Sequence, residues 1–132
     1  MAGYRDRWEY TMTTVACLIE GAGLRRALSP SIGHTRWLVC VDLTSGRELW
    51  IDNRHRGAVA TAGAVIRFGA DRLVCTWIEA GPLRLLRAAG VDVRLAPSTI
   101  PALAALTCAD RLPLACEVDT TPVRLDRHRP GP

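Results

Sequence analysis

The 132-residue sequence has no uninterrupted apolar run of 18 residues, the length that a membrane-spanning helix requires. Its opening stretch, "MAGYRDRWEYTM", carries acidic residues and lacks the apolar segment of a secretory signal. These two absences predict a cytoplasmic protein that does not bind membranes. The chain is nevertheless 48% hydrophobic, which is enough for one core, and its length fits a single domain.

The sequence also lacks any C-x-x-C pair, although it contains five cysteines. An odd number of scattered cysteines argues against a zinc knuckle, a ferredoxin-type cluster site or a secreted disulfide framework. Buried, reduced thiols are the simplest account of most of them.

Lysine is absent, and all seventeen basic residues are arginines spread along the chain. Only the tail "RLDRHRPGP" is locally basic. Proteins that bind nucleic acid usually carry a denser basic stripe with aromatic side chains placed for stacking. The formal charge of +4 therefore does not predict a nucleic-acid partner.

The first half of the chain is rich in β-forming residues. "TTVACLI" (13–19) predicts a first strand, and residues 24–28 allow a short helical turn. "RWLVCVDL" (36–43) and "RELWIDN" (47–53) predict two more strands. The short "TSG" connection, in which Gly46 can adopt a positive φ, makes these two strands antiparallel neighbours.

In the second half, helical and strand patterns alternate. We expect a helix in 57–70, a strand in 71–77, a helix from Pro82 to Gly90 and a strand in 91–97. "STIPALAAL" (98–106) predicts a last helix, with Ser98 or Thr99 as its N-cap.

The element order is therefore β-β-β-α-β-α-β-α. Strands that alternate with helices imply right-handed crossovers and parallel pairing, whereas the hairpin adds an antiparallel part. The predicted fold class is α/β, a mixed five-stranded sheet flanked by helices.

Enzyme motifs are missing. The sequence has no G-x-S-x-G elbow, no H-E-x-x-H and no phosphate-binding P-loop. A two-metal nuclease would require several carboxylates, and only Asp42, Asp52 and Asp71 stand at predicted strand ends. Acids in such positions are more often solvated turn residues, so we do not expect an enzyme.

A binding site is the better expectation, because ligands usually sit beyond the carboxyl ends of parallel strands. The strand in 71–77 contains Cys75 and Thr76 and leads into a helix N-terminus, whose amides favour an anion. The loop "SPSIGHT", with Ser31, Gly33 and His34, would line the same site if the first strand is its neighbour. Thiol and imidazole are ligands for iron, so the combination suits an anionic metal–sulfur cluster.

Several segments together resemble the dinitrogenase iron–molybdenum cofactor-binding family, the NifX/NifY-type proteins. "VACLIE" looks like the family's opening strand, and "SPSIGHTRWLVCVDLTSGRELWIDNR" is similar to its S-x-H-F-G strand, its D-x-x-T-G hairpin and the segment that follows. The stretch from "HRGAVATAGAVIRFGADRLVC" to "AAGVDVRLAP", followed by "STIPALAAL", is similar to the family's remaining helices and strands. The likeness spans residues 13–107.

This resemblance implies a ribonuclease H-like fold without catalysis. It implies a carrier of the iron–molybdenum cofactor or its iron–sulfur precursor, with a nitrogenase assembly scaffold or apo-dinitrogenase as partner. It divides the chain into an N-terminal arm (1–12), a cofactor-binding-like domain (13–107) and a C-terminal extension (108–132) that is disordered at its end.

One departure affects the site. The family's histidine position falls on Ser31, and His34 stands where the family often has arginine. Three readings follow: His34 reaches the cluster from a shifted position, Cys75 is the ligand, or this chain has lost cluster binding. The last reading makes it a protein-interaction or regulatory module. With that choice open, the candidate site is Ser31, Gly33, His34, Cys75 and Thr76, and the candidate metal ligands are His34 and Cys75.

Overall fold

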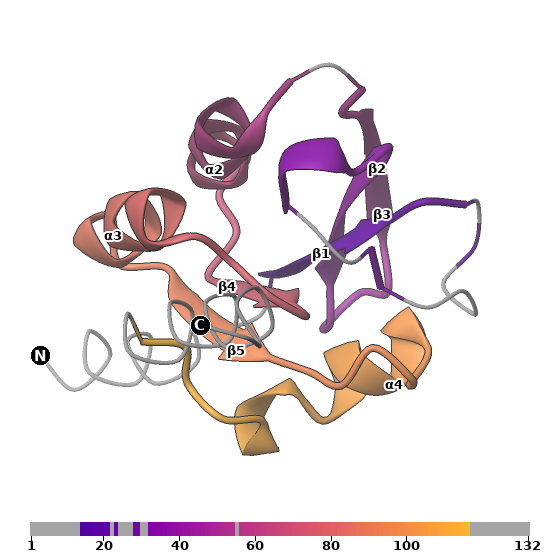
Figure 1. Ribbon diagram of the computed structural model, residues 1–132. Coiled ribbons are helices and arrows are strands. Elements are labelled where there is room, and N and C mark those ends of the chain that lie inside the picture. Colours follow the sequence, from indigo (N-terminus) through magenta and orange to yellow (C-terminus); the bar gives the residue numbers. More distant parts are fainter. Residues whose placement is uncertain (1–13, 22, 24–27, 30–31, 55, 117–132) are drawn as a thin grey trace, which may run out of the picture.

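A computed structural model describes residues 14–21, 23, 28–29, 32–54 and 56–116 (Figure 1). The predicted arm (1–12), most of the possible turn in 24–28 and the end of the C-terminal extension lie outside these described residues.

One mixed sheet organises the fold. Its strand order is β3-β2-β1-β4-β5. The hairpin strands and β1 pair antiparallel, whereas β1, β4 and β5 pair in parallel. The antiparallel hairpin and the parallel half were predicted, and the place of β1 between them is a finding of the structure. The strands are β1 (Thr14–Ile19), β2 (Trp37–Asp42), β3 (Glu48–Asp52), β4 (Arg72–Cys75) and β5 (Asp92–Leu95).

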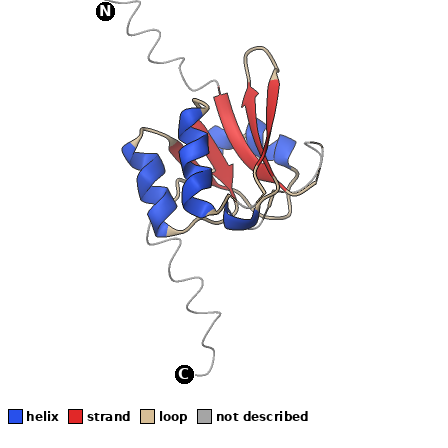
Figure 2. Ribbon diagram, turned by 90° about the horizontal axis from the view of Figure 1, so that it is seen from above, coloured by secondary structure: helices blue, strands red, loops and turns tan. Residues whose placement is uncertain are grey.

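Helices cover both faces of this sheet (Figure 2). The helices α2 (Ala58–Arg67) and α3 (Ala80–Ala88) pack beside one another on one face, and α4 (Ala102–Thr107) lies on the other (Figure 1). Two short 3₁₀ turns, η1 (Ile32–His34) and η2 (Ala109–Arg111), complete the described elements. The predicted α/β class and the order of its strands and helices are confirmed.

The central strand β1 shows why the chain adopts this layered form. Ala16 and Leu18 are buried toward α2 and α3, whereas Val15, Cys17 and Ile19 are buried toward α4. Because successive side chains of a strand point to opposite faces, a strand covered on both sides must be apolar at every position. That requirement explains the continuous apolar run "VACLI".

The start of α4 corrects one prediction. Neither Ser98 nor Thr99 is its N-cap; Pro101 occupies that position, and no side chain caps the helix. A residue that precedes proline is driven out of the helical region, so Ile100 cannot belong to the helix. The helix therefore begins only at Ala102.

Residues beyond the predicted domain end at 107 also pack on the sheet. The amide of Leu95 donates to the carbonyl of Pro113 over 2.9 Å, and the amide of Ala115 donates to the carbonyl of Val93 over 2.9 Å. Residues 113–115, the covering segment, therefore lie antiparallel beside β5. Ala109 and Ala115 are buried in the two halves of the core.

Candidate functional site

The carboxyl ends of β1 and β4 meet at one edge of the sheet because these strands are parallel neighbours. The antiparallel β2 begins at this edge, and β3 ends there. The same edge therefore collects the loop between β1 and β2, the residues after Asp52 and the starts of α2 and α3. We call this the carboxyl edge.

The loop between β1 and β2 enters the sheet at this edge. The amide of Ser29 donates to the carbonyl of Leu18 over 2.6 Å, and the Thr76 hydroxyl donates to the carbonyl of Ser29 over 3.2 Å. Leu28 and Ser29 thus lie between the ends of β1 and β4. Ser29, the first residue of the loop "SPSIGHT", therefore lies beside the end of β4.

Four buried polar residues stand out at the carboxyl edge: Ser29, Thr35, Asn53 and Thr61. They are all the buried polar residues in the described part of the chain, and hydrogen bonds join them. The Thr35 hydroxyl donates to Ser29 Oγ over 3.0 Å, while Asn53 Nδ2 donates to the Thr35 carbonyl over 3.3 Å and to Thr61 Oγ1 over 2.9 Å. We call this chain of contacts the polar network.

The polar network fixes three segments relative to one another. It joins the loop before β2, the end of β3 and the first turn of α2, where the Thr61 hydroxyl donates to the Gly57 carbonyl over 2.6 Å. At its other end, the Ser29 hydroxyl donates to Glu20 Oε2 over 3.1 Å. Buried polar groups that are hydrogen-bonded in this way make a loop rigid.

Two buried polar atoms beside the network have no partner in the described chain. They are Asn53 Oδ1, on a residue that is 2% exposed, and Arg56 Nε. The Arg56 guanidinium uses Nη2 to donate to the Asp52 carbonyl over 3.2 Å. An orphaned acceptor and an orphaned donor are costly to bury, and ligands or water commonly complete such groups.

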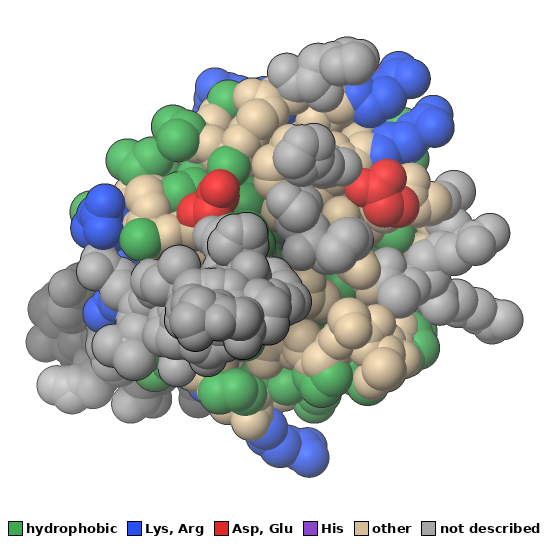
Figure 3. All heavy atoms as spheres, in the orientation of Figure 1, with side chains coloured by type: hydrophobic (Ala, Val, Ile, Leu, Met, Phe, Trp, Pro, Cys, Tyr) green, Lys and Arg blue, Asp and Glu red, His purple; other side chains and the backbone are tan. Residues whose placement is uncertain are grey.

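Arginines and acids both lie at this edge, where Glu20 follows β1, Asp52 ends β3 and Glu79 precedes α3. Arg36, Arg54 and Arg56 lie next to the ends of β2 and β3, and Figure 3 shows basic and acidic side chains side by side over these strands. Arg54 donates to Asp52 from Nη2 over 2.8 Å and from Nε over 3.1 Å. The hydrogen bonds from Arg54, with the charge of Arg36 as a smaller cause, lower the pKa of Asp52 to about 2.

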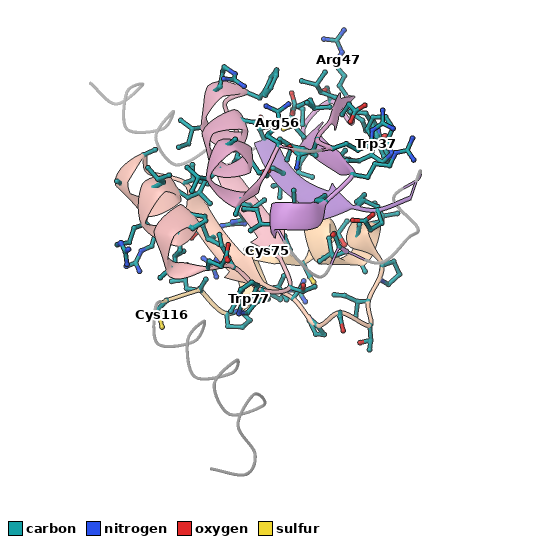
Figure 4. The ribbon with its side chains drawn as sticks, turned by 45° about the horizontal axis from the view of Figure 1, so that its top comes forward. Trp37, Arg47, Arg56, Cys75, Trp77 and Cys116 are labelled. Atoms are coloured by element: carbon teal, nitrogen blue, oxygen red, sulfur yellow. The ribbon has the colours of Figure 1, made fainter. Side chains whose placement is uncertain are left out.

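The start of α2 adds backbone donors. Gly57 precedes the helix with a φ of 84°, which only glycine adopts without strain, and no side chain caps the first turn. Uncapped amides at a helix N-terminus carry a partial positive charge that favours anions. Figure 4 shows Arg56 beside this helix.

Cys75, a predicted ligand, is 1% exposed and belongs to the core beneath α2 and α3. The apolar residues Ile32 of η1 and Ile78 belong to the same part of the core. Burial raises the pKa of the Cys75 thiol to about 12, so it is protonated at neutral pH. A thiol must lose its proton to bind a metal, and this environment opposes that loss.

The other predicted site residues lie in or next to the loop before β2. Gly33 is half-buried within η1, and the backbone of His34 ends this turn. Ser31 lies outside the described residues, as does the side chain of His34. Thr76 is engaged with the Ser29 carbonyl. No group of three or more His, Cys, Asp and Glu side chains that could hold a metal ion occurs among the described residues.

Sequence reasoning missed the polar network. Asn53 was assigned only to the end of a predicted strand, and Thr61 to a helix of small residues. The available signal is Thr61, the one polar residue in the run of small and apolar residues "AVATAGAVI" (58–66). Burial of these side chains depends on how the loop packs, which no periodicity reveals.

The carboxylates considered for a nuclease do not converge. Asp42 ends β2 at the hairpin, whereas Asp52 ends β3 at the other end of these strands, on the carboxyl edge. Asp71 is near the hairpin end, where its Oδ2 accepts from the amide of Thr14 over 3.1 Å. Asp52 is therefore separated from the other two by the length of the strands.

The chain matches no protein-family model and no curated protein. Solved structures do share its fold. The apo form of the orange protein from Desulfovibrio gigas is 23% identical with a TM-score of 0.72, covering 80% of this chain and 94% of that one. A putative NifB protein from Thermotoga is 19% identical with a TM-score of 0.65, covering 76% and 89%. A putative dinitrogenase from Methanocaldococcus jannaschii is 10% identical with a TM-score of 0.62, covering 77% and 93%.

These likenesses establish the fold and extend over most of the chain. Among the described residues, no helix is long and apolar enough to cross a membrane.

Proposed function

We propose that this chain is a non-enzymatic carrier that binds an anionic metal–sulfur cluster at the carboxyl edge, as cargo. The iron–molybdenum cofactor or its iron–sulfur precursor is the cargo that the family resemblance favours. The unpartnered Arg56 Nε carries the proposal, because it is a buried, charged donor that the rigid polar network holds in place and that has no partner in the described chain.

The chemistry of the edge suits an anion. Arg36 and Arg56 are not engaged in an ion pair with any described acid, and the uncapped start of α2 adds backbone donors beside them. Charge-assisted hydrogen bonds from guanidinium groups are among the strong ones, and several such donors can hold a cluster through its sulfides without a thiolate. In this arrangement Arg56 and the α2 amides bind, and the polar network positions them.

Cys75 does not fit as a ligand in this conformation, because its thiol is buried and protonated. His34 stays a candidate ligand, since it ends η1 at the same edge. The cluster is therefore held chiefly by charge and hydrogen bonds, with at most one protein side chain coordinated to it.

The structural neighbours support the cargo class. One is described as a putative NifB protein, one as a putative dinitrogenase and one as an apo form, which is a protein without its bound group. A nitrogenase assembly scaffold or apo-dinitrogenase is then the partner that we propose for delivery.

The test is an anaerobic titration of the purified protein with isolated iron–molybdenum cofactor and, separately, with its iron–sulfur precursor. Co-eluting iron after gel filtration gives the bound amount, and tryptophan quenching gives the affinity. We expect Arg56→Ala to weaken binding by about 10-fold or more, which is the usual value of a charge-assisted hydrogen bond.

Arg67→Ala is the matched control, because Arg67 lies at the opposite end of the same helix. It should leave binding unchanged. His34→Ala identifies or eliminates imidazole ligation, and Cys75→Ser should leave binding unchanged. Saturable binding with the same affinity in the wild-type protein and in Arg56→Ala would contradict the proposed site.

The alternative is a protein-interaction or regulatory module that no longer binds a cluster. The absence of described three-ligand groups and the serine at position 31 favour it. Failure of both clusters to bind the wild-type protein under anaerobic conditions would establish this alternative over the carrier.

A further inference from the structure

Within the described part of the chain, the strand β3 forms an open edge of the sheet. It pairs with β2 on one side only, whereas the last strand at the other end, β5, is covered by residues 113–115. Figure 2 shows the β2–β3 hairpin projecting at one end of the sheet, away from α2 and α3.

The pairing pattern identifies the exposed backbone groups. The Asp42 amide donates to the Arg47 carbonyl over 2.9 Å, and the Asn53 amide donates to the Arg36 carbonyl over 2.8 Å. Because hydrogen bonds alternate along an antiparallel pair, odd-numbered residues of β3 face β2 and even-numbered residues face outward. No described residue hydrogen-bonds to the outward backbone groups of Glu48 and Trp50. These two residues form the β3 edge together with Asp52, whose amide points outward but whose carbonyl accepts from Arg56 Nη2.

The side chains of this edge are acidic around an aromatic centre. The Trp50 indole donates to Glu48 Oε1 over 2.9 Å and meets Trp37 edge-on, with ring centroids 5.9 Å apart. Asp52 is paired with Arg54, but no basic side chain among the described residues pairs with Glu48. The β3 edge therefore offers one uncompensated carboxylate, a second acid and an apolar ring on the same side.

A second copy of the chain is a poor occupant of this edge. The longest symmetric pairing would centre on Trp50 and set Glu48 opposite Asp52 of the other copy. Like charges directly opposite each other destabilise a strand pair. Shifting the register by two residues avoids this contact but leaves fewer of the outward positions paired.

A hollow of about 440 Å³ lies next to the first half of β3, on the opposite side of the strand from Trp50. Leu49, 47% exposed, and Phe68, 40% exposed, line it together with Cys40. The hollow is also lined by Asp42, Arg47 and Glu48. An added strand would place alternate side chains toward Trp50 and toward Leu49 in this hollow. Backbone pairing combined with side-chain pockets is how proteins recognise extended peptides.

We propose that the β3 edge docks an extended segment of a partner protein, with a basic residue opposite Glu48 and an apolar residue opposite Trp50. The docked segment would run from the hollow to the carboxyl edge, where β3 ends. Docking does not depend on cluster binding, so the two proposals can fail separately.

The test uses a synthetic peptide, Thr-Arg-Val-Leu-Val-Arg-Thr, and a control in which glutamates replace both arginines. Amide exchange of the uniformly ¹⁵N-labelled protein gives the signature. Saturating arginine peptide should slow exchange of the Glu48, Trp50 and Asp52 amides at least 10-fold, while Leu49 and Ile51, already bonded to β2, change little.

A charge swap gives the second arm. Glu48→Arg should lower the affinity for the arginine peptide 10-fold or more and raise the affinity for the glutamate peptide. Asp110→Arg, on η2, should change neither affinity. Three results would overturn the proposal. They are equal affinity for both peptides, slowed amide exchange that does not alternate between even-numbered and odd-numbered residues of β3, and a concentration-dependent dimer in sedimentation that buries the β3 edge.

Discussion

At one end of the sheet, β5 is covered by residues 113–115, and its Asp92 is held between two arginines. At the other end, none of the residues that the structure describes covers β3, and its Asp52 makes an exposed pair with Arg54. The Asp92 carboxylate accepts from Arg72 Nε over 2.5 Å and from Arg94 Nε over 2.8 Å, with side chains 12–19% exposed. The Arg54 and Asp52 side chains are 53% and 48% exposed.

The two ends thus solve the problem of an unpaired strand differently. β5 is closed by the chain itself, which removes the backbone groups that another strand could use. β3 keeps those groups but carries acids that discourage pairing with a second copy. An edge that rejects copies of itself yet keeps its hydrogen-bonding groups can be selective for a basic partner.

The largest expected effect comes from breaking the ion pairs at β5. Asp92→Ala leaves Arg72 and Arg94 without their shared carboxylate in a mostly buried position, and we expect a loss of about 3 kcal/mol in the free energy of unfolding. Urea unfolding followed by circular dichroism measures it.

Asp52→Ala is the matched control at β3, and it should hardly move the unfolding midpoint because its pair is exposed. Equal effects of the two substitutions would show that the two edges do not differ in the way described.

A smaller effect should follow from loosening the covering segment. Ala115→Pro removes the amide that donates to Val93, and we expect a loss of about 1 kcal/mol together with a tendency to associate through the uncovered β5. Leu114→Pro is the control, because in an antiparallel pair the Leu114 amide points away from β5. Unfolding and sedimentation velocity compare the two. Identical behaviour would mean that the segment does not close the edge through these bonds.

The sequence does not predict that residues 113–115 cover β5, whereas it does predict the β2–β3 hairpin that forms the other edge of the sheet. Two β-rich runs on either side of Gly46 predict the hairpin, and Gly46 has the expected positive φ of 81°. The covering segment is only three residues long, begins with Pro113 and has no periodicity. Its pairing exists because η2 returns the chain to β5, and Arg94 secures this return by donating to the Leu112 carbonyl over 2.7 Å.

The candidate site likewise has features that the sequence predicts and features that it does not. The alternation of helices and strands predicts a parallel half of the sheet, whereas the pairing of β1 with β4, which brings the loop "SPSIGHT" to the carboxyl edge, comes from the structure. The buried positions of Ser29, Thr35 and Asn53 were not predictable, since each is an ordinary polar loop or strand-end residue until tertiary packing covers it. Cys75 was placed on the right strand, but its burial depends on the helices and on η1.

The reactivity of Cys40, beside β3, should differ from that of Cys75, in the core beneath the helices. Burial raises the pKa of Cys40 to about 11 and that of Cys75 to about 12. Cys40 lines the hollow beside β3 and is 5% exposed, so iodoacetamide at pH 8 should modify it several-fold faster than Cys75. Mass spectrometry of timed samples measures both rates, and the partly exposed Cys108 is the fast reference.

The same thiols make stability depend on alkaline pH. The pKa of each thiol in the folded state is raised above its usual value of 9.0, so the stabilisation is complete below pH 9 and is lost as the pH rises through about 11 to 12. Unfolding midpoints that stay constant from pH 9 to 11 would contradict this burial.

The smallest expected effect concerns Asp52. Arg54 lowers the pKa of this carboxyl from 3.8 to about 2, so the contribution of the pair to stability is present above pH 3.8 and is lost as the pH falls through about 2. A ¹³C-detected titration of the carboxyl group should give the low value in the wild-type protein and a value near 3.8 in Arg54→Ala. Arg67→Ala should leave the titration of Asp52 unchanged. Because solvent screens this exposed pair, the shift should shrink in 1 M salt, unlike the effect of Asp92→Ala at the closed edge, where mostly buried groups are screened far less.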